Sequence, residues 1–288
     1  MVIYDNEQII IFDLATNKEV NRAKIDSDIF AIGISPDNKQ IVYCKNNCAV
    51  IVLNLDNMLH RVIVDGKYIM KPASFIVSPN HEKLTVAIGS TTGYVHLIRD
   101  NFEMATCIGN DPISHLSFSR DGKYLLTGSD CINVLDITNF LVLVKKITYV
   151  CMKKAVLSND GKKIYCFDQI NQLTICLSEN FEICNHQSFG ADSKVGFVVS
   201  PNEDFIAAFD AYWLVIRQKD TIRIMYYNLY IEYCNMVIRN IFFTPNQELI
   251  VLEKHAVLRC GSDSQIKFGI PEKICDVSNQ ALLAVSKN

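Results

Sequence analysis

The chain has 288 residues, of which 49% are hydrophobic and 20% are charged, so its composition excludes an intrinsically disordered protein. This length suits one large all-β domain or two ordinary domains, and it needs no disulfides for stability. The net charge of −3 argues against a general affinity for nucleic-acid phosphates, which requires a clustered basic face.

The sequence shows no pattern for membrane insertion or secretion. Its apolar runs are short and interrupted by polar residues, and the first residues, MVIYDNEQIIIFDL, lack a basic region and a cleavage site. Eleven cysteines are scattered without a CxxC pair, and several stand in strand-like runs, such as Cys44, Cys166, Cys176 and Cys260. Because free thiols explain this pattern better than disulfides, we expect a reducing compartment, the cytoplasm or the nucleus.

Two strand-like runs, MVIYDN and EQIIIFDL, open the chain, and a polar turn then recurs to its end. Each turn starts with Ser or Thr and usually continues with Pro, Asn, Asp or Gly, which preset or tolerate turn geometry. A short apolar run stands on each side of each turn. The turns recur at intervals of 34 to 44 residues and begin at Ser35, Ser78, Ser119, Ser158, Ser200, Thr244 and Ser278.

Each turn is followed by further runs that also favour strands. A third run follows closely, as in AVIVLNLD, YVHLIRD and INVLDI, and a weaker fourth run precedes the next turn, as in HRVIV, EMATCI and LVLVKKI. Four strands in roughly 40 residues, with no helical stretch, are typical of a propeller blade. We therefore predict an all-β fold, a seven-bladed β-propeller of four-stranded antiparallel blades, as one domain over residues 1–288.

The stretch DGKYLLTGSDCINVLDI, residues 121–137, resembles the core of a WD-repeat unit. Asp136 stands in place of that family's closing Asp, and Leu135 stands in place of its Trp. The chain contains no Gly-His or Trp-Asp dipeptide, so it resembles a degenerate WD-repeat protein whose blades hold together mainly by apolar packing. The resemblance implies a subunit of an intracellular multiprotein complex.

The first residues supply spare strands for the last blade. IIIFDL resembles the third run of the other units and ends at Asp13. We expect the N-terminal segment to close the ring, with Ile9 to Leu14 as the outer strand of the last blade, which removes exposed sheet edges. Whether MVIYDN adds a strand there stays open.

One unit departs from the pattern. If TIRIMYYN is its third run, about seven surplus residues lie in FDAYWLVIRQKD, residues 209–220, which predicts an extended hairpin in the fifth blade. Aromatic and arginine side chains are enriched at binding hot spots, so the hairpin is a candidate partner-binding site, formed by Tyr212, Trp213, Arg217 and Lys219. The alternative is that the nearby tyrosines pack between blades.

Chemical motifs give no support for catalysis. The sequence contains no GxGxxG, P-loop, HExxH or GxSxG spacing. The aspartates after the turns, Asp37, Asp121 and Asp160, are interpreted as turn residues that bond their own backbone. Single histidines are scattered over different units, at His60, His81, His96, His115, His186 and His255. We therefore expect no enzyme, no catalytic residues, no cofactor and no metal.

Two clusters carry alternatives to a structural role. Cys44 and Cys48 are four residues apart, a spacing that would place both on one face of a continuous strand, and they give a weak zinc hypothesis, against buried thiols. Lysine pairs stand in the third and fourth units, at Lys145–Lys146, Lys153–Lys154 and Lys162–Lys163. They are typical of protected strand edges, and the alternative is a patch for an acidic partner or RNA.

These observations predict a non-catalytic scaffold for protein–protein interaction within an intracellular complex. Its expected partners are other proteins, with nucleic acid only inside a ribonucleoprotein, no membrane insertion and no small-molecule substrate. Two alternatives stay open. One is a propeller enzyme or small-molecule binder with polar residues converging on a central channel, and the other is an RNA-contacting subunit of a ribonucleoprotein particle.

Overall fold

The structure is a computed structural model of the whole chain, and its described residues form strands, turns and no helix. No described segment is therefore a helix long and apolar enough to cross a membrane. The described residues are 1–5, 8–25, 29–66, 71–78, 84–99, 102–119, 121–138, 141–148, 152–158, 161–168, 172–177, 183–188, 196–209, 213–218, 224–228, 237–244, 246–253, 256–260, 272–276 and 282–284.

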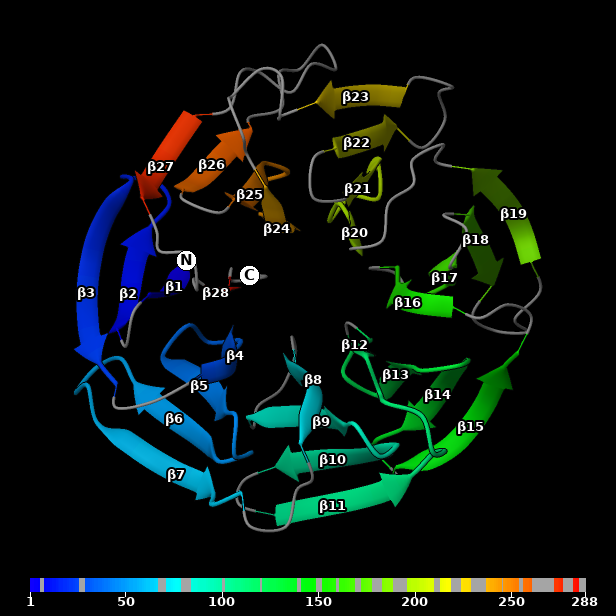
Figure 1. Cartoon of the computed structure of the whole chain (residues 1–288), viewed down its shortest axis with the longest axis horizontal. Helices are drawn as coiled ribbons and strands as arrows, with labels where there is room; N and C mark the ends of the chain where they lie inside the picture. The colour runs from blue at the N-terminus through cyan, green and yellow to red at the C-terminus, as the bar shows by residue number, and fades with distance from the viewer. Residues whose placement is uncertain are drawn as a thin grey trace. The chain divides into compact units, whose positions relative to one another are not determined.

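The strands form seven antiparallel sheets of four strands each, which group into two compact units. One unit comprises mainly Met1–Arg22 and Gln187–Lys287, and the other comprises mainly Ala23–Gln169 and Leu173–His186. Figure 1 shows the strands of each sheet side by side. The prediction of an all-β fold with repeated four-stranded sheets is confirmed, and a single domain over residues 1–288 stays a prediction.

The unit built mainly from Ala23–Gln169 contains four sheets in chain order. The first consists of β4 (Ile29–Ile34), β5 (Gln40–Lys45), β6 (Val50–Asn54) and β7 (His60–Val64). The second consists of β8 (Pro72–Val77), β9 (Thr85–Ser90), β10 (Tyr94–Arg99) and β11 (Phe102–Cys107). The third consists of β12 (His115–Phe118), β13 (Tyr124–Gly128), β14 (Ile132–Asp136) and β15 (Val142–Ile147). The fourth consists of β16 (Met152–Leu157), β17 (Lys163–Asp168), β18 (Gln172–Leu177) and β19 (Ile183–Ser188).

The other unit contains three sheets. One consists of β20 (Gly196–Val199), β21 (Phe205–Phe209), β22 (Trp213–Gln218) and β23 (Ile224–Asn228). The next consists of β24 (Ile238–Phe243), β25 (Leu249–Glu253), β26 (Ala256–Cys260) and β27 (Glu272–Asp276). The last has the order β28 (Leu282–Ala284), β1 (Val2–Asp5), β2 (Gln8–Asp13) and β3 (Lys18–Lys24).

The last sheet joins the two ends of the chain. β1 pairs with β28 on one side, with Ile3 opposite Leu283, and with β2 on the other side. MVIYDN therefore does add a strand. The prediction that Ile9 to Leu14 form the outer strand is wrong, because β2 lies between β1 and β3. The outer strand is β3. Its sequence, KEVNRAK, is polar, so a search for apolar runs does not find it.

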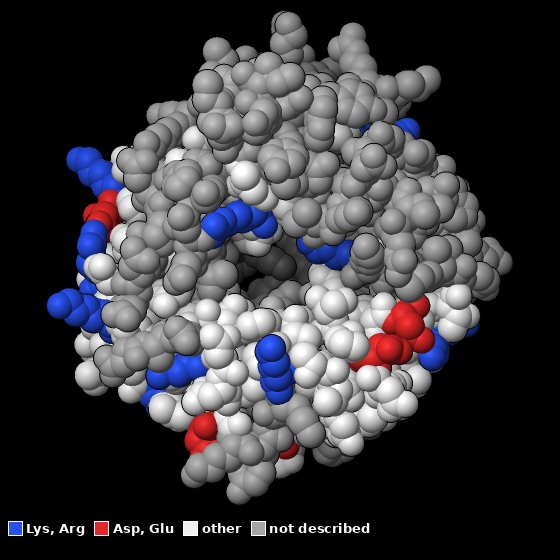
Figure 2. Space-filling view, in the orientation of Figure 1, with Lys and Arg blue, Asp and Glu red and all other residues white. Residues whose placement is uncertain are grey.

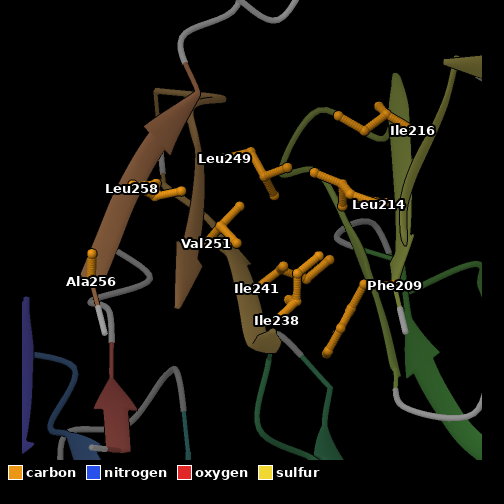
Figure 3. Packing of buried hydrophobic residues seen from close by; sticks show 10 residues of the cluster. Phe209, Leu214, Ile216, Ile238, Ile241, Leu249, Val251, Ala256 and Leu258 are labelled. Carbon is orange, nitrogen blue, oxygen red and sulfur yellow. The ribbon is translucent and has the colours of Figure 1, made fainter. Parts of the chain in front are cut away.

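Neighbouring sheets within each unit pack through apolar side chains. The second and third strands of a sheet are buried on both faces, as in β5 and β6, whereas fourth strands such as β7 and β15 are largely exposed. Figure 3 shows one such contact, where Leu214 and Ile216 of β22 point toward Leu249 and Val251 of β25. Because such a sheet has two apolar faces, it gains stability by packing against a neighbouring sheet of its unit.

The repeated turn is held by a buried hydroxyl. In five sheets the Ser or Thr oxygen accepts a hydrogen bond of 2.8–3.1 Å from the backbone N–H that opens the second strand, or directly precedes it. The hydroxyls belong to Ser35, Ser119, Ser158, Ser200 and Thr244. All five residues are buried, at 1–4% exposure, so the hydroxyl replaces water for a backbone donor inside the protein. Ser278 lies outside the described residues.

Turn aspartates reinforce this hydroxyl. Ser35 and Ser119 each donate to the aspartate two residues later, Asp37 and Asp121, at 2.6 Å. Both carboxylates also accept a backbone N–H, from Lys39 and Lys123 at 3.0 Å. The hydrogen bond from Ser35 holds the pKa of Asp37 below its ordinary value. The interpretation of these aspartates as turn residues is confirmed, and Asp160 lies outside the described residues.

The residue three positions after the Ser or Thr adopts a left-handed backbone. Gly122 and Gly161 fill this position at φ of 65° and 70°. Asn38, Glu203 and Gln247 fill it at 59°, 63° and 67°. Only glycine adopts this region without a steric penalty from its Cβ atom, and Asn tolerates it better than most residues. The turns at Glu203 and Gln247 therefore carry backbone strain that the turn at Gly161 lacks.

Loss of one turn hydroxyl is expected to destabilise the protein. Ser119→Ala leaves the buried N–H of Tyr124 without its acceptor, so the free energy of unfolding should fall by about 1–3 kcal/mol, measured by urea denaturation. Ser78→Ala is the matched control. Ser78 is equally buried, but its hydroxyl has no hydrogen-bond partner among the described residues, so its removal should be neutral or stabilising. Equal losses in the two variants would contradict the role of the hydroxyl.

Exchanging residues at the left-handed position is expected to change stability in opposite directions. Gly161→Ala should lower the free energy of unfolding by about 1–2 kcal/mol through backbone strain alone, because nothing lies within 4 Å of the added Cβ. Glu203→Gly should raise it by up to about 1 kcal/mol. Both are measured by urea denaturation, and a change of the same sign in both variants would show that side-chain contacts, not φ, govern this turn.

Candidate functional site

The residues predicted to bind partners occupy an ordinary strand position. Trp213 opens β22 opposite Asn228, and Arg217 pairs with Ile206 of β21 and Ile224 of β23. The run WLVIRQ is thus the third strand of its sheet, and IMYYN is the fourth. The prediction of an extended hairpin in residues 209–220 is wrong. WLVIRQ is itself the third strand, so the residues that looked surplus belong to the ordinary four-stranded sheet.

What these residues bind stays a prediction. Tyr212 and Lys219 lie outside the described residues, and the side chain of Trp213 does as well. Arg217 is half-buried, and its Nε atom has no hydrogen-bond partner in the part of the chain that the structure describes. The three residues between Trp213 and Arg217 are buried, namely Leu214, Val215 and Ile216. The described part of the segment is therefore largely core.

Arg259 occupies the position in its third strand that corresponds to Arg217 in the preceding sheet. Arg259 pairs with Ile250 in β25, just as Arg217 pairs with Ile206 in β21. Its guanidinium donates to the Leu14 carbonyl and to Asn17 Oδ1, the latter at 2.9 Å, so it links two neighbouring sheets. Nε of Arg259 also lies 3.8 Å from Glu248 Oε2. Arg259 therefore connects two sheets, and no such contact is described for Arg217.

Three histidines whose side chains the structure describes each lie within hydrogen-bonding distance of another residue. His60 Nδ1 lies 3.0 Å from the Tyr43 hydroxyl, and His96 Nδ1 lies 2.9 Å from Glu103 Oε1 within one sheet. His115 Nε2 lies 2.8 Å from the Ala155 carbonyl oxygen of the next sheet. They do not converge, and no three His, Cys, Asp or Glu residues lie together as metal ligands over the described ranges.

Cys44 and Cys48 are buried free thiols. Burial, and to a smaller extent the neighbouring Cys48, raises the pKa of the Cys44 thiol to about 12. Burial also raises the pKa of Cys48. The interpretation as buried thiols fits these cysteines, and zinc binding stays an untested alternative.

The outer strand of the third sheet exposes an unusual run of side chains. Val142, Leu143 and Val144 of β15 are 48%, 49% and 53% exposed, and Lys145 and Lys146 follow them, also exposed. We define Val142–Lys146 as the β15 edge. The outer strands β3, β7 and β11 each place one large apolar residue in the exposed class, namely Val20, Val62 and Phe102. Three consecutive exposed aliphatic residues on a sheet edge are a candidate interaction site.

Strand pairing fixes how the β15 edge presents its side chains. Leu143 lies opposite Leu135, Lys145 opposite Val134 and Lys146 opposite Asn133. The register shifts between these pairs, so Val144 has no partner residue in β14. Because neighbouring residues of a strand point to opposite faces, Lys145 and Lys146 project from different faces of the sheet. The sequence alone indicates only a strand and a lysine pair in VLVKK. Its exposure depends on the place of β15 at the end of the sheet.

The positively charged residues outside the β15 edge include those on one face of the molecule and the other lysine pairs. On the face shown in Figure 2, the described Lys and Arg side chains lie singly or in small groups among uncharged residues. Lys162 is exposed in a turn, Lys154 is half-buried, and the side chain of Lys153 lies outside the description. On this face, the residues that the structure describes do not form the continuous basic surface that nucleic-acid binding favours.

Neither a protein-family model nor a curated protein matches the sequence. Among solved structures, the chain is similar to one of hydrazine synthase from Kuenenia stuttgartiensis, with a TM-score of 0.68 and 15% identity. The alignment covers 83% of this chain and 78% of that chain. At this identity the likeness shows a shared fold alone.

This likeness corrects one expectation. The chain was predicted not to be an enzyme, on the ground that its motifs and its propeller-like repeats suit a scaffold. The similar fold belongs to a protein named as a synthase, so a fold of this kind does not exclude catalysis. The expectation of no enzyme is therefore overturned as an inference from fold and motifs.

Proposed function

We propose that the chain is an interaction platform, a subunit of an intracellular multiprotein complex, built as a closed seven-bladed β-propeller. The ring is supported by the seven four-stranded sheets and by the sheet that joins the two ends of the chain. It is also supported by apolar packing of successive sheets within each unit. The WD-repeat resemblance adds that such rings assemble complexes through their surface.

The β15 edge is the observation that carries this proposal. Exposed edge strands usually carry charges, bulges or proline, because an apolar edge promotes association. The β15 edge leaves three aliphatic side chains about half-exposed in a row. Covering them with a partner removes apolar surface from water, which stabilises the assembly by roughly 25 cal/mol per Å². The register shift at Val144 and the two lysines protect part of this edge, and a partner bound there would cover the aliphatic side chains that remain exposed.

A reducing compartment fits the thiols. Cys44, Cys48, Cys107, Cys131 and Cys166 are free cysteines, and these are the ones whose state is described. We propose the cytoplasm or the nucleus as its compartment, and the free thiols support this proposal.

Replacing the aliphatic run is expected to release the partner. A triple variant, Val142→Thr, Leu143→Thr and Val144→Thr, keeps side chains that favour strands but makes the edge polar. Tagged protein purified from its native cell should lose at least one protein in this variant, measured by quantitative mass spectrometry against the unaltered chain. The matched control, Val20→Thr with Val62→Thr, changes exposed valines on β3 and β7 and should lose none.

Circular dichroism and thermal melting must first show that both variants fold. Identical protein sets from the two folded variants would remove the β15 edge as a contact and leave the platform without its main support. Recovery that disappears after nuclease treatment would identify RNA rather than protein as the partner.

A further inference from the structure

We propose that β11 mediates self-association of the chain: two copies pair their β11 strands in antiparallel orientation, with a two-fold axis at Ala105. β11 is the end strand in the order β11-β10-β9-β8 and pairs with β10. Figure 1 shows it at the outer end of its sheet. β11 and the β15 edge belong to different sheets, so β11 is a second interaction surface beyond the proposed function.

β11 lacks the features that protect an outer strand from pairing with another chain. Its pairing with β10 runs residue by residue from Phe102 to Cys107 without a register shift, whereas the pairings of β7, β15 and β27 each contain one. β23 also pairs without a shift, and its side chains lie outside the described residues. β11 contains no Lys, Arg or Pro. Bulges, lysines and prolines are common protection for edge strands, so β11 is a regular template for a further strand.

The one charged residue of β11 is engaged within its own sheet. Glu103 Oε1 lies 2.9 Å from Nδ1 of the buried His96 in β10. The other side chains of the strand are uncharged. Phe102 is 62% exposed, and Ala105 and Cys107 are exposed as well. An approaching strand therefore meets an edge that is accessible and mostly neutral.

The backbone of β11 directs alternate residues away from its sheet. Ile108, directly after the strand, donates its N–H to the Gly93 carbonyl at 2.9 Å, which continues the register with β10. In an antiparallel pair, residues that exchange hydrogen bonds alternate with residues that do not. Every second residue of β11 therefore bonds to β10, and the residues between them direct their N–H and C=O groups outward. These outward residues are Glu103, Ala105 and Cys107.

A second copy of the strand matches these outward groups. With Ala105 opposite its own copy, Glu103 lies opposite Cys107, so all outward residues face outward residues and exchange hydrogen bonds with them. The two glutamates do not oppose each other, and the small side chain of Ala105 lies at the axis. On the other face, the exposed Phe102 lies opposite Ile108, an aromatic and β-branched pair that favours strand pairing. β11 is thus complementary to itself, which favours a second copy over an unrelated segment.

Sedimentation velocity of the full chain over a concentration series tests the self-association. We expect a monomer–dimer equilibrium, because a single strand pair is a small interface. Ala105→Lys places two lysines opposite each other at the axis and should weaken the dimer at least about tenfold. Val62→Lys on β7 is the matched control, since Val62 is also exposed on an outer strand, and it should leave the dimer unchanged.

Circular dichroism and thermal melting must first show that both lysine variants fold. An unaltered chain that stays monomeric at every concentration would overturn the proposal. A dimer that is equally strong in Ala105→Lys would place the contact elsewhere and would overturn it as well.

A disulfide locates the axis independently. In a Cys107→Ser background, Ala105→Cys places two thiols at opposed positions whose Cα atoms are about 5.5 Å apart, which a disulfide bridges. Oxidation by diamide should then cross-link two copies, measured by non-reducing electrophoresis against Cys107→Ser alone.

Thr106→Cys in the same background is the matched control for the register. The two copies of this position lie on a diagonal, about 7–8 Å apart, so the control should cross-link at least about tenfold less. Equal cross-linking of the two variants would overturn the register. Cross-linking of Ala105→Cys no stronger than in Cys107→Ser alone would overturn pairing through β11.

Discussion

Apolar packing between successive sheets is the constraint on which this structure depends. The second and third strands of the sheets are buried on both faces, so no single sheet can stand in water by itself. Each sheet therefore needs neighbours, and chain order supplies them within each unit. Gly33 shows how close this approach is, because an added Cβ would lie 2.5 Å from Val77 in the next sheet. The fourth strand lies outside this packing, so its side chains are largely exposed to solvent, as in β7 and β15.

The turn hydroxyls define where each sheet begins. A buried Ser or Thr accepts the N–H at the start of the second strand, and a left-handed residue three positions later turns the chain back. Further along the same sheet, Leu135 is buried and Asp136 accepts hydrogen bonds from Thr138 in the next turn. Local hydrogen bonds thus define the repeated turn, and apolar packing holds the sheets together.

The turns could be predicted from the sequence because their contacts are local. The order of the strands in each sheet could not be predicted in the same way. Six of the seven turn residues lie where expected, because Ser35 and its equivalents act through neighbours in sequence. The polar strand β3 was missed, and β22 was mistaken for an insertion, because apolar runs alone do not number strands. The β15 edge was not singled out, since VLVKK reads as any other strand until its place at the end of a sheet is known.

The sheet made from both ends of the chain is the feature that most directly tests this architecture. Residue-resolved hydrogen exchange measures it, since amides of β1 and β28 are protected only while the two termini stay paired. The amides of Tyr4 and Leu282, which lie opposite each other and bond across this pair, should exchange as slowly as those of β25 in the neighbouring sheet. Rapid exchange in β1 and β28, with β25 still protected, would contradict the closure of the chain on itself.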